Sequence, residues 1–408
     1  MPMSKNEKIV VGLDIGTTKT CAIVADVVDA QKVNIIGIGT HPSSGIRKGV
    51  IVNIESTVEA IRKAVDEAEL MAGVQINSVY AGIAGSHIKG FNSRGVIAVK
   101  EHEVGIADIR RVIGAAKAVA IPQDREILHI LPQTFTVDDQ DGIKDPMGMS
   151  GTRLEAEVHI ITGAVTSSQN ITKSIQRAGL DVSELILQPM ASSESVLFDE
   201  EKELGVILVD IGGGTTDIAV FRNGSIWHTA VIPIGGNHIT NDIAVGLRTP
   251  VADAEKIKMK YGCLMRQANG AEEPIEVPSV GGRTPRILSG RFMSEIIESR
   301  VTEIFKLVSQ EIKKCGQMEM VASGLVITGG SALMEGMSDV AEKVLDLPVR
   351  VGYPLQVGGV ADVVRSPMYA TGVGLILHSV RTREKPEQQS NQNGPLATKI
   401  REWFKELF

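Results

Sequence analysis

The chain has 408 residues, which is long enough for two or more domains that each bury a hydrophobic core. Its net charge of −7 argues against a general nucleic-acid binder, because affinity for the phosphate backbone comes from concentrated Lys and Arg. Aromatic residues make up only 3% of the chain, so its cores must consist mainly of aliphatic side chains. This composition favours layered α/β packing over an aromatic-rich β-sandwich.

The cysteines, Cys21, Cys263 and Cys315, are far apart and form no Cys-x-x-Cys pair, which predicts a reducing compartment and no metal site. The polar residues 1–8 lead directly into an apolar strand, so no signal peptide is expected. No apolar run approaches the length of about 20 residues needed to span a bilayer. We therefore expect the body of the protein in the cytoplasm.

Two segments share one pattern, in which an apolar strand ends at an Asp, a glycine-rich turn follows, and a second apolar strand begins. The first turn reads Asp14-Ile15-Gly16-Thr17-Thr18-Lys19. The second turn reads Asp210-Ile211-Gly212-Gly213-Gly214-Thr215-Thr216-Asp217. This repeat predicts an internal duplication and two lobes of related topology.

Each turn suits a phosphate group, because Gly lets the backbone approach closely and successive N–H groups form an anion-binding concavity. A carboxylate cannot contact phosphate directly, so Asp14 and Asp210 are expected to orient water around Mg²⁺. The predicted phosphate contacts are Gly16, Thr17, Thr18, Lys19, Gly212, Gly213, Gly214, Thr215 and Thr216. Ordinary tight hairpins are the alternative, but two copies in a duplicated chain favour phosphate binding.

Two further features complete the predicted nucleotide site. The turn Gly329-Gly330-Ser331 follows an apolar strand and suits a flat base. Glu255 and Lys258 lie three residues apart on one helical face and are predicted to hold ribose hydroxyls. A solvated helical pair is the alternative, and these two residues alone favour it. The sequence lacks the G-x-x-x-x-G-K-[ST] motif of P-loop enzymes.

Apolar spacing predicts the remaining elements. Helices are expected at 54–72, 168–178, 251–260, 291–314 and 368–380. The helix 291–314 carries an apolar stripe of Phe292, Ile296, Val301 and Ile304. Segment 87–161 differs from its surroundings, since short β-like runs at 96–99, 127–130, 134–137 and 157–161 surround one helix at 107–120. We interpret it as an inserted α+β subdomain.

The segment 396–408 has apolar residues at i, i+4, i+7, i+8, i+11 and i+12, which places them on one face of a helix. They are Leu396, Ile400, Trp403, Phe404, Leu407 and Phe408. The preceding segment 381–395 is rich in Gln, Asn, Pro and charge and predicts a disordered linker. Together they predict an amphipathic helix on an anionic membrane surface; docking on the protein's own core is the alternative.

The order of these motifs resembles that of the actin, heat-shock chaperone and sugar kinase superfamily. That order is a phosphate loop, a connecting helix, a second phosphate loop, an adenosine loop and a second connecting helix, here at 14–19, 188–196, 209–217, 326–337 and 368–377. Within the superfamily, the sequence closely resembles the FtsA family of bacterial cell-division proteins over essentially its whole length. The most specific matches are 142–155, 277–283 and the tail.

The resemblance implies an α/β fold of the actin type, with duplicated ribonuclease H-like lobes, an inserted α+β subdomain and a C-terminal amphipathic helix. The implied parts are 1–86, 162–204 and 366–380 for the first lobe (subdomain 1A), 87–161 for the insert (1C), 205–236 and 315–365 for the second lobe (2A), 237–314 for subdomain 2B, 381–395 for the linker and 396–408 for the membrane-targeting helix.

The resemblance also implies a protein that binds ATP with Mg²⁺, assembles with itself into filaments and attaches the tubulin-like division protein FtsZ to the cytoplasmic face of the inner membrane at the septum. The C-terminal peptide of FtsZ is expected on subdomain 2B, where Arg300 and Glu303 fall in a matching Ser-Arg-x-x-Glu stretch. Later division proteins are expected to bind through subdomain 1C.

One residue bears on hydrolysis. ATPases of this superfamily often carry Glu just before the Pro of the first connecting helix, whereas here Gln188 precedes Pro189. An amide cannot take a proton, although it can orient water, so we expect slow turnover at most and a mainly structural role for ATP. A small-molecule kinase or a chaperone-like ATPase on the same fold is the alternative.

Overall fold

The computed structural model describes residues 8–29, 32–264, 274–281, 283–314, 316 and 321–383. The tail at 396–408 and nearly all of the linker lie outside these residues, so both remain predictions. Within the described part of the chain, no helix is long and apolar enough to cross a membrane.

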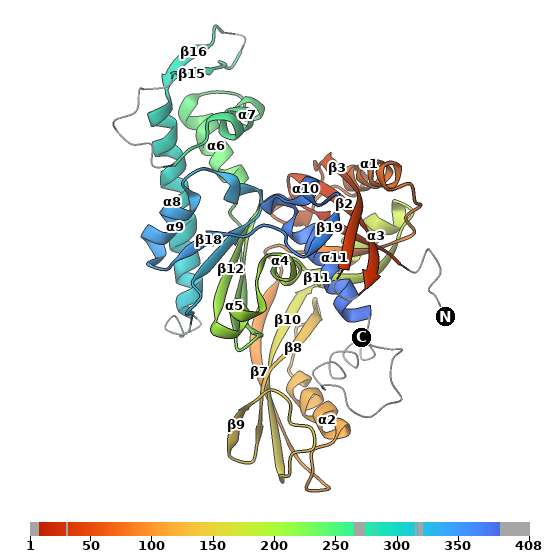
Figure 1. The fold of residues 1–408 in the computed structure, drawn as a ribbon. Helices are drawn as coiled ribbons and strands as arrows, with labels where there is room; N and C mark the ends of the chain where they lie inside the picture. Colours follow the sequence, from red (N-terminus) through yellow and green to blue (C-terminus); the bar gives the residue numbers. More distant parts are fainter. Residues whose placement is uncertain are drawn as a thin grey trace.

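Two β-sheets form the centres of two lobes (Figure 1). The first sheet has the order β11-β6-β1-β2-β3-β19, with strands Asp181–Leu187, Ser78–Ile83, Ile9–Ile15, Lys19–Asp29, Lys32–Pro42 and Val357–Gly359. The second has the order β14-β13-β12-β17-β18, with strands Ser225–Ile232, Thr216–Arg222, Val206–Ile211, Leu325–Thr328 and Val349–Val351.

The two sheets repeat one topology. β1 pairs antiparallel with β2 and parallel with β6, just as β12 pairs antiparallel with β13 and parallel with β17. One more antiparallel strand and one more parallel strand extend each sheet in the same way. The predicted duplication is therefore confirmed. One strand departs from the predicted lobe boundaries. β19 lies within 315–365, which was assigned to the second lobe, and yet it pairs with β3 of the first lobe.

The helices of the first lobe follow their apolar spacing. α1 (Ile54–Ala72) has the predicted bounds. It begins after Asn53, whose side chain accepts a hydrogen bond from the backbone N–H of Ser56, and it ends at Gly73 in the left-handed conformation. α3 (Val165–Arg177) begins three residues earlier than the 168–178 that we predicted.

The inserted subdomain has its own sheet, helix and core. Its sheet has the order β7-β10-β8-β9, with strands Lys89–Ala98, Arg153–Ala164, Arg125–Val137 and Gln140–Ile143, and α2 (Ile106–Lys117) packs on it. The two predicted runs at 127–130 and 134–137 are one strand, β8. Pro132 interrupts the sequence pattern, but the strand continues because Pro132 lies at an irregularity of the pairing with β10.

The inserted subdomain projects below both lobes in Figure 1 and contacts the second as well as the first. The Nε2 atom of His159 lies 2.9 Å from the hydroxyl of Thr229 on β14. Gln133 donates to the backbone carbonyl of Ile226 on the same strand. Just after β9 of the insert, the ammonium of Lys144 lies 2.6 Å from the carboxylate of Glu203 on the second lobe.

The second lobe carries most of the remaining elements. They are α5 (Asp199–Leu204), α6 (Gly236–Leu247), α7 (Val251–Tyr261), β15 (Pro274–Val277), β16 (Arg286–Ser289), α8 (Gly290–Lys314) and α9 (Met337–Leu345), with short elements elsewhere at β4 (Ile46–Arg47), β5 (Val50–Ile51) and α10 (Ala361–Val364). The apolar stripe predicted for α8 is shifted by one residue at its start. Met293 and Ile297 are buried, whereas Phe292 is 47% exposed. Apolar residues stand side by side at 292–293 and at 296–297, so the spacing alone does not decide which residue of each pair faces the core.

Two helices cross at the centre of the molecule. α4 (Gln188–Val196) has the bounds predicted for the first connecting helix. A 3-10 turn (Pro367–Tyr369) precedes α11 (Ala370–Arg383), where one helix from 368 was expected. At the crossing, a Cβ atom on Gly374 of α11 would lie 1.8 Å from the carbonyl oxygen of Ala191 on α4. Only glycine allows the two backbones to approach this closely.

We therefore predict that Gly374→Ala lowers the free energy of unfolding by about 2 kcal/mol or more, because the added methyl group forces the helices apart. Gly114→Ala is the matched control, since it also lies in a helix but has open space around it. That change should stabilise by up to about 1 kcal/mol. Urea denaturation measures both, and equal effects of the two substitutions would contradict the prediction.

Candidate functional site

A cavity of about 450 Å³ lies between the two lobes. It is lined by both glycine turns, by α4, by α7 and by the turn after β17. The structure brings together nearly all of the residues predicted for a nucleotide site, which are Asp14, Gly16, Thr17, Thr18, Lys19, Gln188, Asp210, Gly212, Gly213, Gly214, Thr215, Glu255, Lys258, Gly329, Gly330 and Ser331.

Thr216 is the exception among the predicted phosphate contacts. It is the first residue of β13, it is fully buried, and it does not line the cavity. Its hydroxyl donates to the carbonyl of Ile234. Side chains alternate along a strand, so Thr215 and Thr216 face opposite ways and only Thr215 reaches the cavity.

The two glycine turns have the same hydrogen bond and meet at their tips. The N–H of Gly16 donates to the carbonyl of Lys19 at 3.0 Å, and that of Gly212 donates to the carbonyl of Thr215 at 3.0 Å. A Cβ atom on Gly213 would lie 1.9 Å from the hydroxyl oxygen of Thr18. Glycine is therefore needed here for the close approach of the two lobes.

The N-terminus of α6 lies behind the second turn, a feature that we did not predict. The N–H of Gly236 donates to the carbonyl of Gly212, and the N–H of Asn237 donates to that of Gly213. Asn237 also accepts a hydrogen bond from Thr18. The pair Gly235-Gly236 before the periodic Ile239 is the sequence signal that could have revealed this helix start.

Three buried carboxyl groups lie at the floor of the cavity. Burial raises the pKa of Asp14 to about 6; Lys19 opposes this shift and Asp210 adds to it. Burial also raises the pKa of Asp217 to about 7, with a further contribution from Asp210. The pKa of Asp210 is raised by burial as well, although hydrogen bonds from Ser192 and Thr371 oppose the shift. Asp217 was not among the predicted site residues.

Helix α4 contacts the first acid of each turn. The side-chain amide of Gln188 donates to Asp14 at 3.0 Å. One helical turn later, the hydroxyl of Ser192 donates to Asp210 at 2.7 Å. Thr371 of α11 lies 3.0 Å from Ser192 and 3.4 Å from Asp210. Gln188 was predicted for this place, whereas Ser192 and Thr371 were not.

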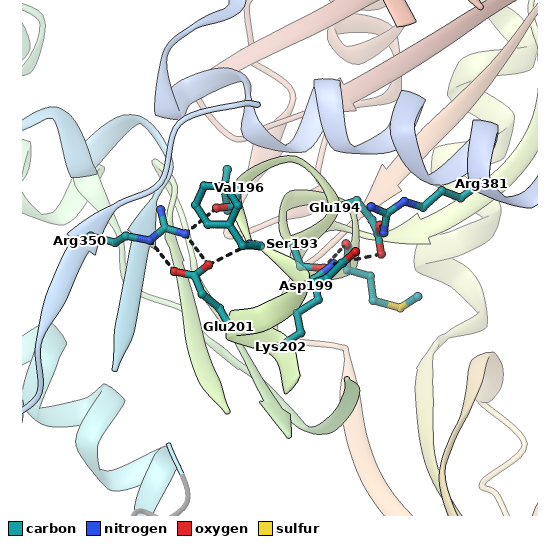
Figure 2. A network of polar contacts seen from close by, with 10 residues as sticks. Ser193, Glu194, Val196, Asp199, Glu201, Lys202, Arg350 and Arg381 are labelled. Carbon is teal, nitrogen blue, oxygen red and sulfur yellow. Dashed lines mark hydrogen bonds and ion pairs between the residues drawn. The ribbon is translucent and has the colours of Figure 1, made fainter. Parts of the chain in front are cut away.

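The other end of α4 is held by a network of ion pairs (Figure 2). The Nη2 atom of Arg350 on β18 donates to the carbonyl of Val196 at 2.8 Å, and the same guanidinium binds both oxygens of Glu201. Glu194 forms ion pairs with Arg381 of α11 and with Lys202 of α5. α4 is thus anchored to three neighbouring elements.

The predicted ribose pair is not solvated on an outer face. The ammonium of Lys258 lies 2.8 Å from the carboxylate of Glu255 and donates to the hydroxyl of Thr240 on α6. Only 11% of the Lys258 side chain is exposed. Both residues line the cavity, and their contact with ribose stays a prediction.

Lys19 has contacts of its own at the edge of the cavity. Its ammonium donates to the carbonyl of Met368 at 3.0 Å and lies 3.9 Å from the centre of the Tyr369 ring. These contacts connect the first turn to the segment before α11. The phosphate contact of Lys19 stays a prediction.

The chemistry of the cavity follows from these parts. Glycine N–H groups and hydroxyl groups suit an anion, and the N-terminus of α6 adds a favourable dipole. Among the described residues, no group of three His, Cys, Asp or Glu side chains could hold a metal ion directly. The predicted role of Asp14 and Asp210 is contact with Mg²⁺ through water, which needs no such group.

Arg300 and Glu303, predicted to bind a partner, lie on α8 and outside the residues that line the cavity. The guanidinium of Arg300 binds both oxygens of Asp242 on α6, at 2.5 and 3.0 Å, and also contacts Glu303. In this structure Arg300 therefore joins α6 to α8.

The buried acids predict how stability depends on pH. Between about pH 4 and pH 7 the folded protein holds more protons on Asp14 and Asp217 than the unfolded chain does, so the free energy of unfolding should fall as pH rises. Asp217→Asn should weaken this dependence and stabilise the protein at about pH 8 by about 1–3 kcal/mol. Denaturation in buffers free of divalent cations and nucleotide measures both, and an unchanged pH slope in the variant would contradict the assignment.

Comparisons with known proteins place the chain in a family. Residues 207–374 match the model for "Cell division protein FtsA", and residues 85–162 match the model for "SHS2 domain inserted in FTSA", close to the insert predicted at 87–161. The cell division protein FtsA of Pseudomonas aeruginosa is 52% identical over 93% of this chain and 91% of its own length. That of Neisseria meningitidis is 47% identical over 100% of both chains.

Solved structures agree on the fold. A PilM-PilN type IV pilus biogenesis complex has a chain that matches with a TM-score of 0.66 at 14% identity, over 91% of this chain and 98% of its own. MreB5 of Spiroplasma citri bound to ADP matches with a TM-score of 0.55 at 14% identity, over 90% of this chain and 94% of its own. The fold is thus actin-like, as predicted, and the chain belongs to the FtsA family of cell-division proteins.

Proposed function

We propose that this protein binds ATP with Mg²⁺ in the cavity between its lobes, assembles with other copies of itself, and attaches FtsZ to the cytoplasmic face of the inner membrane at the division septum. The observation that carries the proposal is the meeting of two glycine turns, one from each lobe, above three buried carboxyl groups. An ATP molecule there would contact both lobes at once.

The residues that line the cavity suit the parts of ATP. Backbone N–H groups and hydroxyls of Thr17, Thr18 and Gly213–Thr215 would hold phosphate oxygens. The N–H of Gly16 instead holds the turn closed through Lys19. A hydrated Mg²⁺ near Asp14 and Asp210 would offset the free-energy cost of ionising these buried acids. The base would lie against Gly329–Gly330, with Glu255 and Lys258 near the ribose.

Gln188 supports slow turnover. One N–H of its side-chain amide donates to Asp14, and its amide oxygen can accept a hydrogen bond from a water molecule and orient it. An amide oxygen cannot take the proton of that water at neutral pH. ATP would therefore act mainly as a ligand that holds the two lobes in one arrangement and favours assembly.

The membrane and partner roles rest on the sequence and on the family. Leu396, Ile400, Trp403, Phe404, Leu407 and Phe408 form the apolar face of the predicted amphipathic helix. A single short helix binds a membrane reversibly, so an assembly that presents many tails would gain avidity. Arg300 and Glu303 mark the surface proposed for the FtsZ peptide, and the inserted subdomain is the surface proposed for later division proteins.

Nucleotide binding is tested by closing the space between the turns. In Gly213→Val the new side chain would collide with Thr18, so the two turns must separate. We expect the affinity for a fluorescent ATP analogue with Mg²⁺ to fall by about tenfold or more, which corresponds to about 1.4 kcal/mol. Gly105→Val is the control, because the nearest atom to its Cβ is 3.7 Å away. Wild-type affinity in Gly213→Val would overturn this site.

Membrane and partner binding are tested together by flotation with anionic liposomes, purified FtsZ and ATP. Full-length protein should float and bring FtsZ with it, whereas protein that ends at Gly394 should lose both. Arg300→Ala should still float but should no longer recruit FtsZ. Asp242→Asn is the control for Arg300→Ala. This change also removes the ion pair between the two residues but keeps the guanidinium of Arg300, so FtsZ should still be recruited. Flotation by the truncated protein would refute the tail as the anchor.

A further inference from the structure

The inserted subdomain reaches the edge of the first-lobe sheet. Among the strands that the structure describes, β11 is the outermost on this side of the sheet, with β6 as its one neighbour. The N–H of Leu187, the last residue of β11, instead donates to the Nε2 atom of His129 at 3.1 Å. His129 belongs to β8 of the inserted subdomain. A side chain of the insert therefore satisfies a backbone group of the first lobe.

The surroundings of His129 keep its ring neutral. Burial lowers the pKa of His129 to about 4, with Glu184 opposing and His378 adding to the shift. Glu184 of β11 and His378 of α11 face the same space, with 3.8 Å between the nearest carboxylate oxygen and ring nitrogen. The hydrogen bond from Leu187 selects the neutral tautomer that carries its proton on Nδ1, because only then does Nε2 have a lone pair to accept it.

Leu187 is directly followed by Gln188. Leu187 is the last residue before α4, and Gln188 is the first residue of that helix. The N–H of Leu187 belongs to the peptide unit before it, so only the φ and ψ angles of Leu187 lie between this hydrogen bond and Gln188. Leu187 is fully buried, so its packing restrains both angles, and the hydrogen bond from its N–H restrains the direction in which the chain enters the helix. Gln188 is also packed tightly on its other side, because a Cβ atom on Gly82 would lie 3.0 Å from its Cγ atom. A shift at Leu187 is therefore expected to change the position of the Gln188 amide relative to Asp14.

We propose that His129 is a positioning residue, which acts through the N–H of Leu187 to hold Gln188 against Asp14 and so links the inserted subdomain to the cavity. The consequence for ATP turnover rests on the proposed function, whereas the link between His129 and Gln188 does not. A partner that displaces β8 would be sensed at Gln188 through this link.

The test compares three variants of the full-length protein. His129→Leu replaces the imidazole with an apolar side chain of similar size and so removes the hydrogen-bond acceptor. His129→Gln restores an acceptor oxygen. Leu131→Ala is the control for general loosening, because Leu131 lies two residues further along the same face of β8 and packs against the first-lobe core. Protein labelled with ¹⁵N-glutamine reports the side-chain amide of Gln188, which Gln188→Glu identifies.

We expect His129→Leu to shift the Gln188 amide signals and to lower the ATP turnover rate at saturation by about fivefold, with the half-saturating ATP concentration changed by less than about twofold. His129→Gln should restore both readouts, and Leu131→Ala should change neither. Unshifted Gln188 signals in His129→Leu, or equal shifts in Leu131→Ala, would overturn the proposal. If the wild type binds no ATP, the proposed function fails, while the amide signals still decide the role of His129.

Discussion

The contact of one short helix with both glycine turns is the constraint on which the cavity depends. Gln188 and Ser192 of α4 are one helical turn apart, and they donate to Asp14 of the first lobe and Asp210 of the second. The spacing of two side chains on a rigid helix therefore sets the relative position of the two turns. A movement of either lobe must break one of these hydrogen bonds or move α4 with it.

α4 can set the relative position of the two turns because neighbouring elements hold it in place. Gly374 lets α11 pack directly against the backbone of α4, and Arg350, Glu201 and Arg381 hold the end of α4 that is remote from the cavity (Figure 2). The buried acids oppose this stability, because burial raises the pKa values of Asp14 and Asp217 and so makes their ionisation unfavourable. A cation that neutralised them would strengthen the closed arrangement.

The sequence predicted the parts of the site that lie within a few consecutive residues. The two Asp-Ile-Gly turns, the duplicated topology and the bounds of α1 follow from local spacing, whereas the bounds of α4 came from the family resemblance. Ser192, Thr371 and Asn237 were missed because a lone hydroxyl or amide gains its meaning from a partner elsewhere in the chain. Thr216 was assigned wrongly to the cavity. The turn ends at Thr215, and Thr216 is the first residue of β13, so its side chain points to the opposite side.

By itself, the sequence determined that two related lobes each present an acid and a glycine turn, because period and turn chemistry are properties of neighbouring residues. Only the tertiary structure decided that one helix holds both acids, that three acids share one buried space, and that His129 of the insert reaches the residue before Gln188. These facts depend on the packing of segments that are far apart in the chain, and such packing is fixed by the shapes of whole elements rather than by any local pattern.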